Sequence, residues 1–402
     1  MGELTSLEAA AVEAARAAPM LDQVQTWAAI NSGSRNLDGL ATMAGLLAGG
    51  FSKLPGSLTL VDAAPVETVR ADGHTAPLDH GRNLHLKVRP EAPLQLLLTG
   101  HYDTVFAADH PFQQVFWRDD GVLGGPGVAD MKSGIAVMLA ALEAVEESPL
   151  ANRIGYEVVL NSDEEVGSPG SAALIAEAAR GKHAALTYEP SALPDGTLAG
   201  ARPGSGNFSI VVRGRSAHAG RNPEEGRNAL VAAADIALRL AQARAPGFKI
   251  NPAKIDGGSP NNVVPDHAVL RVNLRPTTPA DQDHAQRLID ETVAAVAAAH
   301  DVAIHVHGGF GRPPKPMTPE AKRLFELVRD CGRDLGQSIS WRDTGGVCDG
   351  NNIAACGVPV VDTMGARGGA IHSPEEFLIV DSLGERAALS ALTILRLAEG
   401  RP

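Results

Sequence analysis

The stretch Gly125-Pro-Gly-Val-Ala-Asp130-Met-Lys-Ser-Gly134 places an aspartate behind a Gly-Pro-Gly turn and ahead of an apolar run, 135–145. Glycines allow a backbone to bend sharply and to approach a ligand closely. The apolar run predicts a buried helix with Asp130 at its head. Taken alone, the stretch favours a helix cap, because Asp often caps helices. The alternative is a carboxylate that offers both of its oxygens to a cation.

Apolar strands alternate with helices on both sides of this stretch. The runs 94–99, 156–160 and 184–188 are nearly continuous in apolar residues, which is typical of strands buried on both faces. Their alternation with helices predicts an α/β domain with a mostly parallel sheet and flanking helices. We also expect helices at 5–30, 37–49 and 170–180, and strands at 58–61 and 83–88.

Polar residues follow the predicted strands at the point where each strand ends. In α/β sheets, ligands bind outside the carboxyl ends of the strands. Each residue alone has an ordinary explanation as a polar residue at a strand exit or in an exposed turn. The residues in these positions are His101, Asp103, Glu164, Glu165 and Glu189.

A metal site explains these residues together, once His372 of a Gly-rich turn near the C-terminus is added. Histidine nitrogens and carboxylates suit Zn²⁺. Two histidines with three or more carboxylates give at least five ligands, which are too many for one catalytic zinc but fit two metals that share one carboxylate. Two-metal sites with ions about 3.5–4 Å apart are known in hydrolases.

Length and composition exclude other classes of protein. A chain of 402 residues predicts two domains. Its net charge of −12 argues against a nucleic-acid partner, and no run approaches the ~20 apolar residues of a membrane span.

The N-terminus shows no signal peptide, so we expect the cytoplasm, or the periplasm if a signal has been removed. Cys348 is expected to be a small buried residue rather than a nucleophile.

The pattern of predicted helices and strands changes from about Gly206. A predicted β-α-β-α-β pattern follows, with strands at 208–212, 269–274 and 302–306, and it ends at the Pro-rich run 312–319. This length is within the usual size of a small domain. We therefore expect a catalytic domain in two segments, 1–206 and 317–402, with an inserted α+β domain at 207–316.

Five motifs, taken in order, resemble those of the M20 metallopeptidases, the group that includes carboxypeptidase G2, acetylornithine deacetylase, succinyl-diaminopimelate desuccinylase and the aminoacylases. The resemblance covers nearly the whole chain. The motifs are Leu-Thr-Gly-His101-Tyr-Asp103-Thr-Val, Gly-Pro-Gly-Val-Ala-Asp130-Met-Lys-Ser-Gly, Asn-Ser-Asp-Glu164-Glu165-Val-Gly-Ser, Tyr-Glu189-Pro-Ser and Ile-His372-Ser-Pro-Glu-Glu.

The resemblance implies a ligand set for two zinc ions, for which Co²⁺ or Mn²⁺ would be substitutes. Asp130 is implied to bridge the two ions. His101 and Glu189 would complete one site, and Glu165 and His372 the other. The resemblance also implies a cis peptide bond between Asp130 and Met131.

Two further residues receive catalytic roles from the resemblance. Glu164 is implied to be the general base and acid that moves a proton from the attacking water to the leaving amine. Asp103 is implied to orient His101, in the carboxylate–histidine arrangement that is common behind metal-binding histidines.

The inserted domain resembles the lid and dimerisation domain of the family, which implies a homodimer through residues 207–316. His218, in Gly-Arg-Ser-Ala-His218-Ala-Gly, is implied to contact the oxyanion across the dimer. Asn262 is implied to contact the substrate. Arg275 matches an arginine that receives a substrate carboxylate in some members, and a solvated charge at a strand end is the equal alternative.

The sequence therefore predicts a di-zinc amidohydrolase. We expect an enzyme similar to carboxypeptidase G2, which cleaves an N-acyl amino acid or short peptide and releases an amino acid with a free α-carboxylate, for example glutamate. The alternative within the family is an aminoacylase or N-acyl-amino-acid deacetylase. The alternative from another class is a catalytically inactive binding protein on the same fold.

Overall fold

A six-stranded mixed sheet forms the centre of the larger part of the molecule. The computed structural model describes residues 4–243 and 246–400. In this sheet β4 runs antiparallel to both of its neighbours, and the pairs β8–β5, β5–β9 and β9–β16 are parallel. The expected α/β class is confirmed. The strands, in sheet order, are β1 (Ser57–Val61), β4 (Asn83–Val88), β8 (Ile154–Asn161), β5 (Leu94–His101), β9 (Ala184–Thr187) and β16 (Val360–Val361).

Helices cover both faces of this sheet, as the apolar strands require. Leu96 and Leu98 of β5 belong to the large core under one set of helices, whereas Leu97 packs in the core under the other set. Among the described residues, no helix is long and apolar enough to cross a bilayer. One face carries α1 (Ser6–Ala17), α2 (Met20–Ala28), α3 (Leu37–Phe51), α4 (Lys132–Glu146), α8 (Pro319–Asp334) and α10 (Ser382–Ala398), and the other carries α5 (Ala172–Ala179) and α9 (Asp349–Ala355).

The N-terminal segment contains two helices where the sequence predicted one over 5–30. The break falls at Ala18 and Pro19, between α1 and α2. Ala18 is extended, with φ −62° and ψ 141°. A residue before proline is pushed out of the helical region, and proline itself cannot donate a backbone hydrogen bond.

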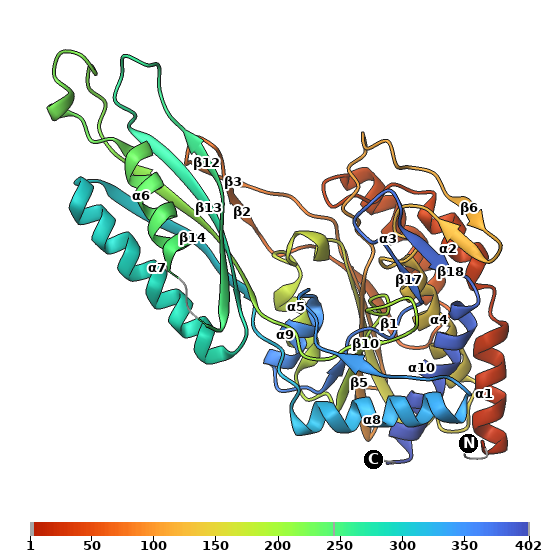
Figure 1. The fold of residues 1–402 in the computed structure, drawn as a ribbon. Helices are drawn as coiled ribbons and strands as arrows, with labels where there is room; N and C mark the ends of the chain where they lie inside the picture. The colour runs from red at the N-terminus through yellow and green to blue at the C-terminus, as the bar shows by residue number, and fades with distance from the viewer. Residues whose placement is uncertain (1–3, 244–245, 401–402) are drawn as a thin grey trace.

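A second, smaller body contains a four-stranded antiparallel sheet with two helices on one face (Figure 1). The sequence predicted no strand at β12, so the expected β-α-β-α-β pattern was wrong. This edge strand is mostly exposed, and a register shift between Pro252 and Lys254 interrupts its alternation, which weakens its sequence signal. The elements are β11 (Ser205–Arg213), α6 (Ala229–Gln242), β12 (Phe248–Gly257), β13 (His267–Pro276), α7 (Pro279–His300) and β14 (Ala303–Arg312). The division into domains at 206/207 and 316/317 stays a prediction.

A hairpin from the first segment reaches the smaller sheet. It consists of β2 (Glu67–Val69) and β3 (Thr75–Pro77), and it lies beside β12 and β13 in Figure 1. Val69 packs against apolar side chains of the smaller sheet. Arg271 Nη2 donates to the carbonyl oxygen of Val69 at 2.6 Å. The two bodies are therefore joined at the hairpin as well as at the chain crossings near Ser205 and Arg312.

The ends of strands in the six-stranded sheet, together with a small sheet of the larger body, bring the polar residues together. His101 is the last residue of β5 and pairs in register with Asn161, the last residue of β8. A four-stranded sheet beside them joins the segment before Asp130 to the segment after His372. Its strands, in order, are β17 (Gly368–Gly369), β18 (Phe377–Ile379), β7 (Val122–Gly124) and β6 (Phe116–Asp119).

Candidate metal centre

Asp130 points its carboxylate into a cavity instead of capping the helix that follows. The residue at the N-cap of α4 is Met131, and no side chain caps this helix. The Asp130–Met131 peptide bond is cis, as expected. Gly127, with φ 74°, makes the preceding turn, and a Cβ there would lie 2.9 Å from Thr104. The capping explanation of the stretch is therefore wrong.

The two oxygens of the Asp130 carboxylate face two different imidazoles. Its Oδ1 atom lies 3.1 Å from His101 Nε2, and its Oδ2 atom lies 3.3 Å from His372 Nε2. Each imidazole nitrogen faces a second carboxylate, Glu189 at 3.7 Å from His101 and Glu165 at 3.0 Å from His372. The arrangement is two histidine–carboxylate pairs that share Asp130.

The pKa values in this cluster are strongly perturbed. Burial, together with the nearby Asp130 charge, raises the pKa of Glu165 and of Glu189 to about 8. Hydrogen bonds to Asp130 and Glu165 raise the pKa of His372 to about 11. Burial lowers the pKa of His101, but Glu189 and the other carboxylates offset this, so that it lies well above its usual value. Groups this crowded hold protons that a bound cation would displace.

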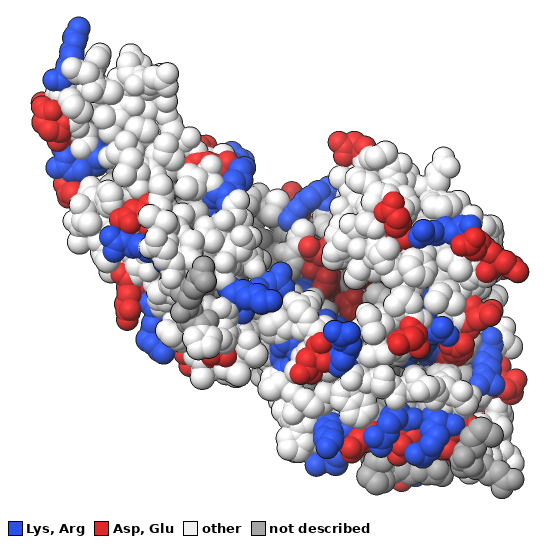
Figure 2. Space-filling view, in the orientation of Figure 1, with Lys and Arg blue, Asp and Glu red and all other residues white. Residues whose placement is uncertain are grey.

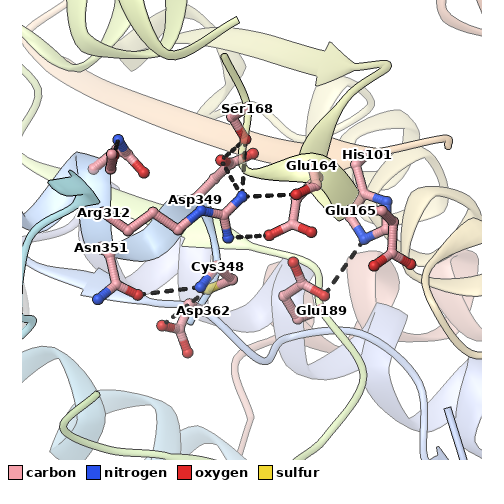
Figure 3. A network of polar contacts seen from close by, with 12 residues as sticks. His101, Glu164, Glu165, Ser168, Glu189, Arg312, Cys348, Asp349, Asn351 and Asp362 are labelled. Atoms are coloured by element: carbon pink, nitrogen blue, oxygen red, sulfur yellow. Dashed lines mark hydrogen bonds and ion pairs between the residues drawn. The ribbon is translucent and has the colours of Figure 1, made fainter. Parts of the chain in front are cut away.

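Glu164 faces the same space and is held by an arginine of the smaller body. One ligand atom from each of His101, Glu164 and Glu189 lies within 4.8 Å of the others. Arg312 Nη1 donates to Glu164 Oε1, and Arg312 Nη2 donates to the Glu164 carbonyl oxygen at 2.9 Å. Figure 3 shows this guanidinium between Glu164 and Asp349. Sequence reasoning missed Arg312 because a charged residue before a Pro-rich run carries no signal of its own.

Asp103 is fully buried and holds both sides of the cluster. Its Oδ1 atom lies 3.3 Å from His101 Nδ1 and accepts the Glu164 N–H at 3.1 Å. Its Oδ2 atom accepts the Glu165 N–H at 3.2 Å and the Ser34 hydroxyl at 2.7 Å. The geometry agrees with a role in orienting His101, and it adds a backbone anchor for the two glutamates.

The Pro-rich run connects the two bodies, but it is anchored in the larger one. Lys315 is 3% exposed, and its Nζ atom lies 2.9 Å from Asp362 Oδ2. Arg202 donates to both oxygens of Asp362, at 2.7 and 3.1 Å. Cys348 is buried beside Asp362, with its Sγ atom at 3.5 Å, as expected for a small buried residue.

The cluster, apart from the buried His101, lines a cavity of about 420 Å³, and Figure 2 shows acidic side chains in the hollow between the two bodies. Arg275 lines an adjoining cavity of about 550 Å³, which shares Arg202 and Thr344 with the first. His218 and Asn262 line neither of these cavities. They lie in the β11–α6 and β12–β13 loops, where His218 forms a β-bridge with Val263.

Comparison with known proteins assigns the chain to a family. Residues 97–396 match the profile of peptidase family M20/M25/M40, and the chain belongs to this family. The resemblance inferred from the motifs is confirmed, and the protein is a hydrolase of M20 type.

Named relatives agree with this assignment. Carboxypeptidase G2 of a Pseudomonas species is 29% identical over 331 residues, which are 81% of this chain and 80% of that protein. Succinyl-diaminopimelate desuccinylase of Xanthomonas oryzae is 30% identical over 327 residues, 75% of this chain and 83% of that protein. A solved Bacillus subtilis structure, described as a dinuclear metal binding peptidase from the M20 family, shares the fold with a TM-score of 0.66 and 15% identity, covering 96% of this chain and 99% of that one.

Proposed function

We propose that this enzyme uses two zinc ions to hydrolyse an amide bond and release an amino acid with a free α-carboxylate. The observation that carries the proposal is the Asp130 carboxylate, whose two oxygens face His101 and His372 at 3.1 and 3.3 Å. Glu189 and Glu165 add one carboxylate to each half. Each ion would then have three protein ligands, which leaves room for water and substrate.

The donor set fits zinc on chemical grounds. Imidazole and carboxylate are zinc ligands, and burial together with the Asp130 charge raises the pKa of Glu165 and of Glu189, so that a cation bound among these carboxylates would be favoured. The description of the Bacillus subtilis relative as a dinuclear metal binding peptidase supports two ions. When bound, zinc would polarise the amide carbonyl and lower the pKa of the attacking water to about 7. Co²⁺ and Mn²⁺ are proposed as substitutes.

Glu164 is the proposed general base and acid. Arg312 holds its Oε1 atom, which leaves Oε2 to accept a proton from the attacking water. The same oxygen returns the proton to the nitrogen of the leaving amine as the carbon–nitrogen bond breaks. Asp103 keeps His101 and the backbone of Glu164 in place for this exchange.

The proposed substrate is an N-acyl amino acid or a short peptide, with glutamate as one released product. Support comes from the relative carboxypeptidase G2 and from Arg275, which lines the adjoining cavity. An aminoacylase or N-acyl-amino-acid deacetylase is the second candidate, because it needs the same metal chemistry and a different acyl pocket. The cytoplasmic location expected from the sequence stays a prediction.

We further propose a homodimer through residues 207–316 in which His218 serves the active site of the partner subunit, and we propose Asn262 as a substrate contact. Both residues lie in loops of the smaller body and do not line the cavity of their own chain. A single donor to an oxyanion contributes about 2.7–4 kcal/mol of transition-state stabilisation. We propose that His218 supplies such a donor from a second copy of the chain.

A substrate panel tests the proposed activity. Zinc-loaded enzyme would be assayed with N-acyl amino acids that vary in acyl group and side chain, together with folate-like amides. Release of glutamate from the folate-like amides supports the carboxypeptidase G2-like activity, whereas turnover of simple N-acyl amino acids alone supports the aminoacylase alternative. Zinc binding without hydrolysis of any member would favour the inactive binding protein.

A further inference from the structure

Glu376 is a buried carboxylate at the end of the Ile-His372-Ser-Pro-Glu-Glu motif, and no role has been given to it so far. It lies four residues after His372 and is 1% exposed. Its Oε1 atom accepts the N–H groups of Ala129 at 2.9 Å and Asp130 at 3.0 Å. Its Oε2 atom accepts the N–H of Gly127 at 3.2 Å. One side chain therefore satisfies three backbone donors of the turn that presents Asp130.

These donors need a partner because the whole turn is buried. Residues 123–141 are all buried, and an unpaired N–H group in such a place is costly. Ionised carboxylate oxygens accept hydrogen bonds from backbone N–H groups more strongly than neutral groups do. Glu376 thus fixes the peptide planes that set the direction of the Asp130 side chain.

The same residue ties the Asp130 segment to the His372 segment. Phe377, the next residue, pairs in β18 with Gly124 of β7, immediately before the turn. The Glu376 N–H donates to the Ser373 carbonyl oxygen at 3.1 Å, inside the turn that follows His372. The carboxylate and the strand pairing together fix the spacing between the Asp130 oxygens and the His372 imidazole.

We propose that Glu376 is a positioning residue for the metal centre, which sets the affinity of the site by holding Asp130 in its bridging orientation. The inference rests on the proposed metal-dependent function. It concerns the geometry of the Asp130 carboxylate, and Glu376 itself contacts neither metal nor substrate. Groups that hydrogen-bond behind metal ligands typically change metal affinity or activity by about 10–100-fold when they are replaced.

The test compares Glu376→Gln with Glu375→Gln. Glutamine has the shape of glutamate, but its amide nitrogen would face at least one of the three N–H donors. Glu375 is the adjacent, exposed glutamate, and its replacement is the matched control. Zinc affinity would be measured by competition with a chromogenic chelator, and the visible spectrum of the Co²⁺-substituted protein would report the ligand geometry.

The expected result is a loss of about 10–100-fold in zinc affinity for Glu376→Gln, with an altered Co²⁺ spectrum and no change for Glu375→Gln. Wild-type zinc affinity and an unchanged Co²⁺ spectrum in Glu376→Gln would overturn the proposal, even if thermal stability fell. If Glu376→Gln does not fold, Glu376→Asp, which keeps the charge but shortens the reach, must show the same losses. A wild-type protein that binds no zinc would instead overturn the proposed function.

Discussion

Arg312 and Glu164 form a buried ion pair that joins the end of the smaller sheet to the proposed catalytic carboxylate. Arg312 is the last residue of β14 and is 4% exposed. Its guanidinium binds the side chain and the carbonyl oxygen of Glu164. Burial lowers the pKa of Arg312, but the Glu164 charge and its other acidic neighbours offset this and raise it above its usual value.

The pair leads to a first prediction, for Arg312→Lys. Lysine keeps the charge but replaces the planar fork with a single point charge, so Glu164 should lose its fixed orientation. We expect a fall in kcat of about 10²-fold with unchanged zinc content, because Glu164 is not a proposed ligand. Arg323→Lys, at an exposed position on α8, is the control. An Arg312→Lys enzyme with the kcat of wild type would contradict the orientation argument.

The second prediction concerns Glu164→Gln, which keeps the shape of the side chain and removes the proton acceptor. The loss of a general base typically costs roughly 10²–10⁴-fold in rate, while zinc occupancy should stay that of wild type. Rate and metal content are measured on the same preparation, so that loss of base and loss of metal are separated. Near-normal turnover in this variant would remove Glu164 from its proposed role.

Much of the candidate site could be predicted from the sequence because its residues follow apolar strands. His101, at the end of β5, is one such residue, and the cluster around Asp130 assembles where the parallel strands end. Arg312 and Glu376 could not be found this way. Each is a charged residue whose burial depends on a contact over more than 140 positions, and no local pattern encodes such a contact.

The elements that the sequence did not predict, β12 and the hairpin of β2 and β3, both lack a strong local sequence signal. The edge strand β12 has a mostly exposed side-chain pattern, so its hydrophobic periodicity is weak. The hairpin of β2 and β3 consists of three-residue strands that are held by the smaller sheet through Val69 and Arg271. Such short strands depend on tertiary contacts rather than on local propensity.

A third prediction tests whether His218 acts across a dimer. Separately, His218→Ala and Glu164→Gln homodimers should be nearly inactive. In a mixed dimer, action in trans places both lesions in one site and leaves the other intact, which restores up to half of the activity per mixed dimer. No recovery after verified subunit exchange, or a fully active His218→Ala enzyme, would exclude the proposed role.

A fourth prediction concerns stability in acid and Glu157 of β8. Burial raises the pKa of Glu157, but hydrogen bonds from His85 at 2.5 Å and Lys182 at 2.8 Å lower it to about 2. Because this folded-state pKa lies below the unfolded value of about 4.3, its stabilisation is present above about pH 4.3 and is lost as the pH falls towards 2.

We therefore expect Glu157→Gln to be less stable than wild type by about 1–2 kcal/mol near neutral pH, less than the full pKa shift implies because water partly screens these ion pairs, with the difference shrinking as the pH falls from 5 to 2. Urea unfolding of the proteins, after a chelator has removed bound metal, measures this difference in stability. Glu91→Gln, at an exposed position, should have the stability of wild type throughout. A gap between Glu157→Gln and wild type that does not vary with pH would show that the ion pairs do not set this pKa.

The most direct test of the central claim is a titration of chelated, metal-free enzyme with zinc, in which bound metal and hydrolysis of an N-acyl amino acid are followed together. The account predicts two zinc ions per chain and no hydrolysis before zinc is added. Replacing Asp130, whose carboxylate lies within 3.3 Å of both imidazoles, with Ala should weaken binding of both ions. Full hydrolysis by the metal-free enzyme, or a chain that binds no zinc, would contradict the proposed two-zinc hydrolysis.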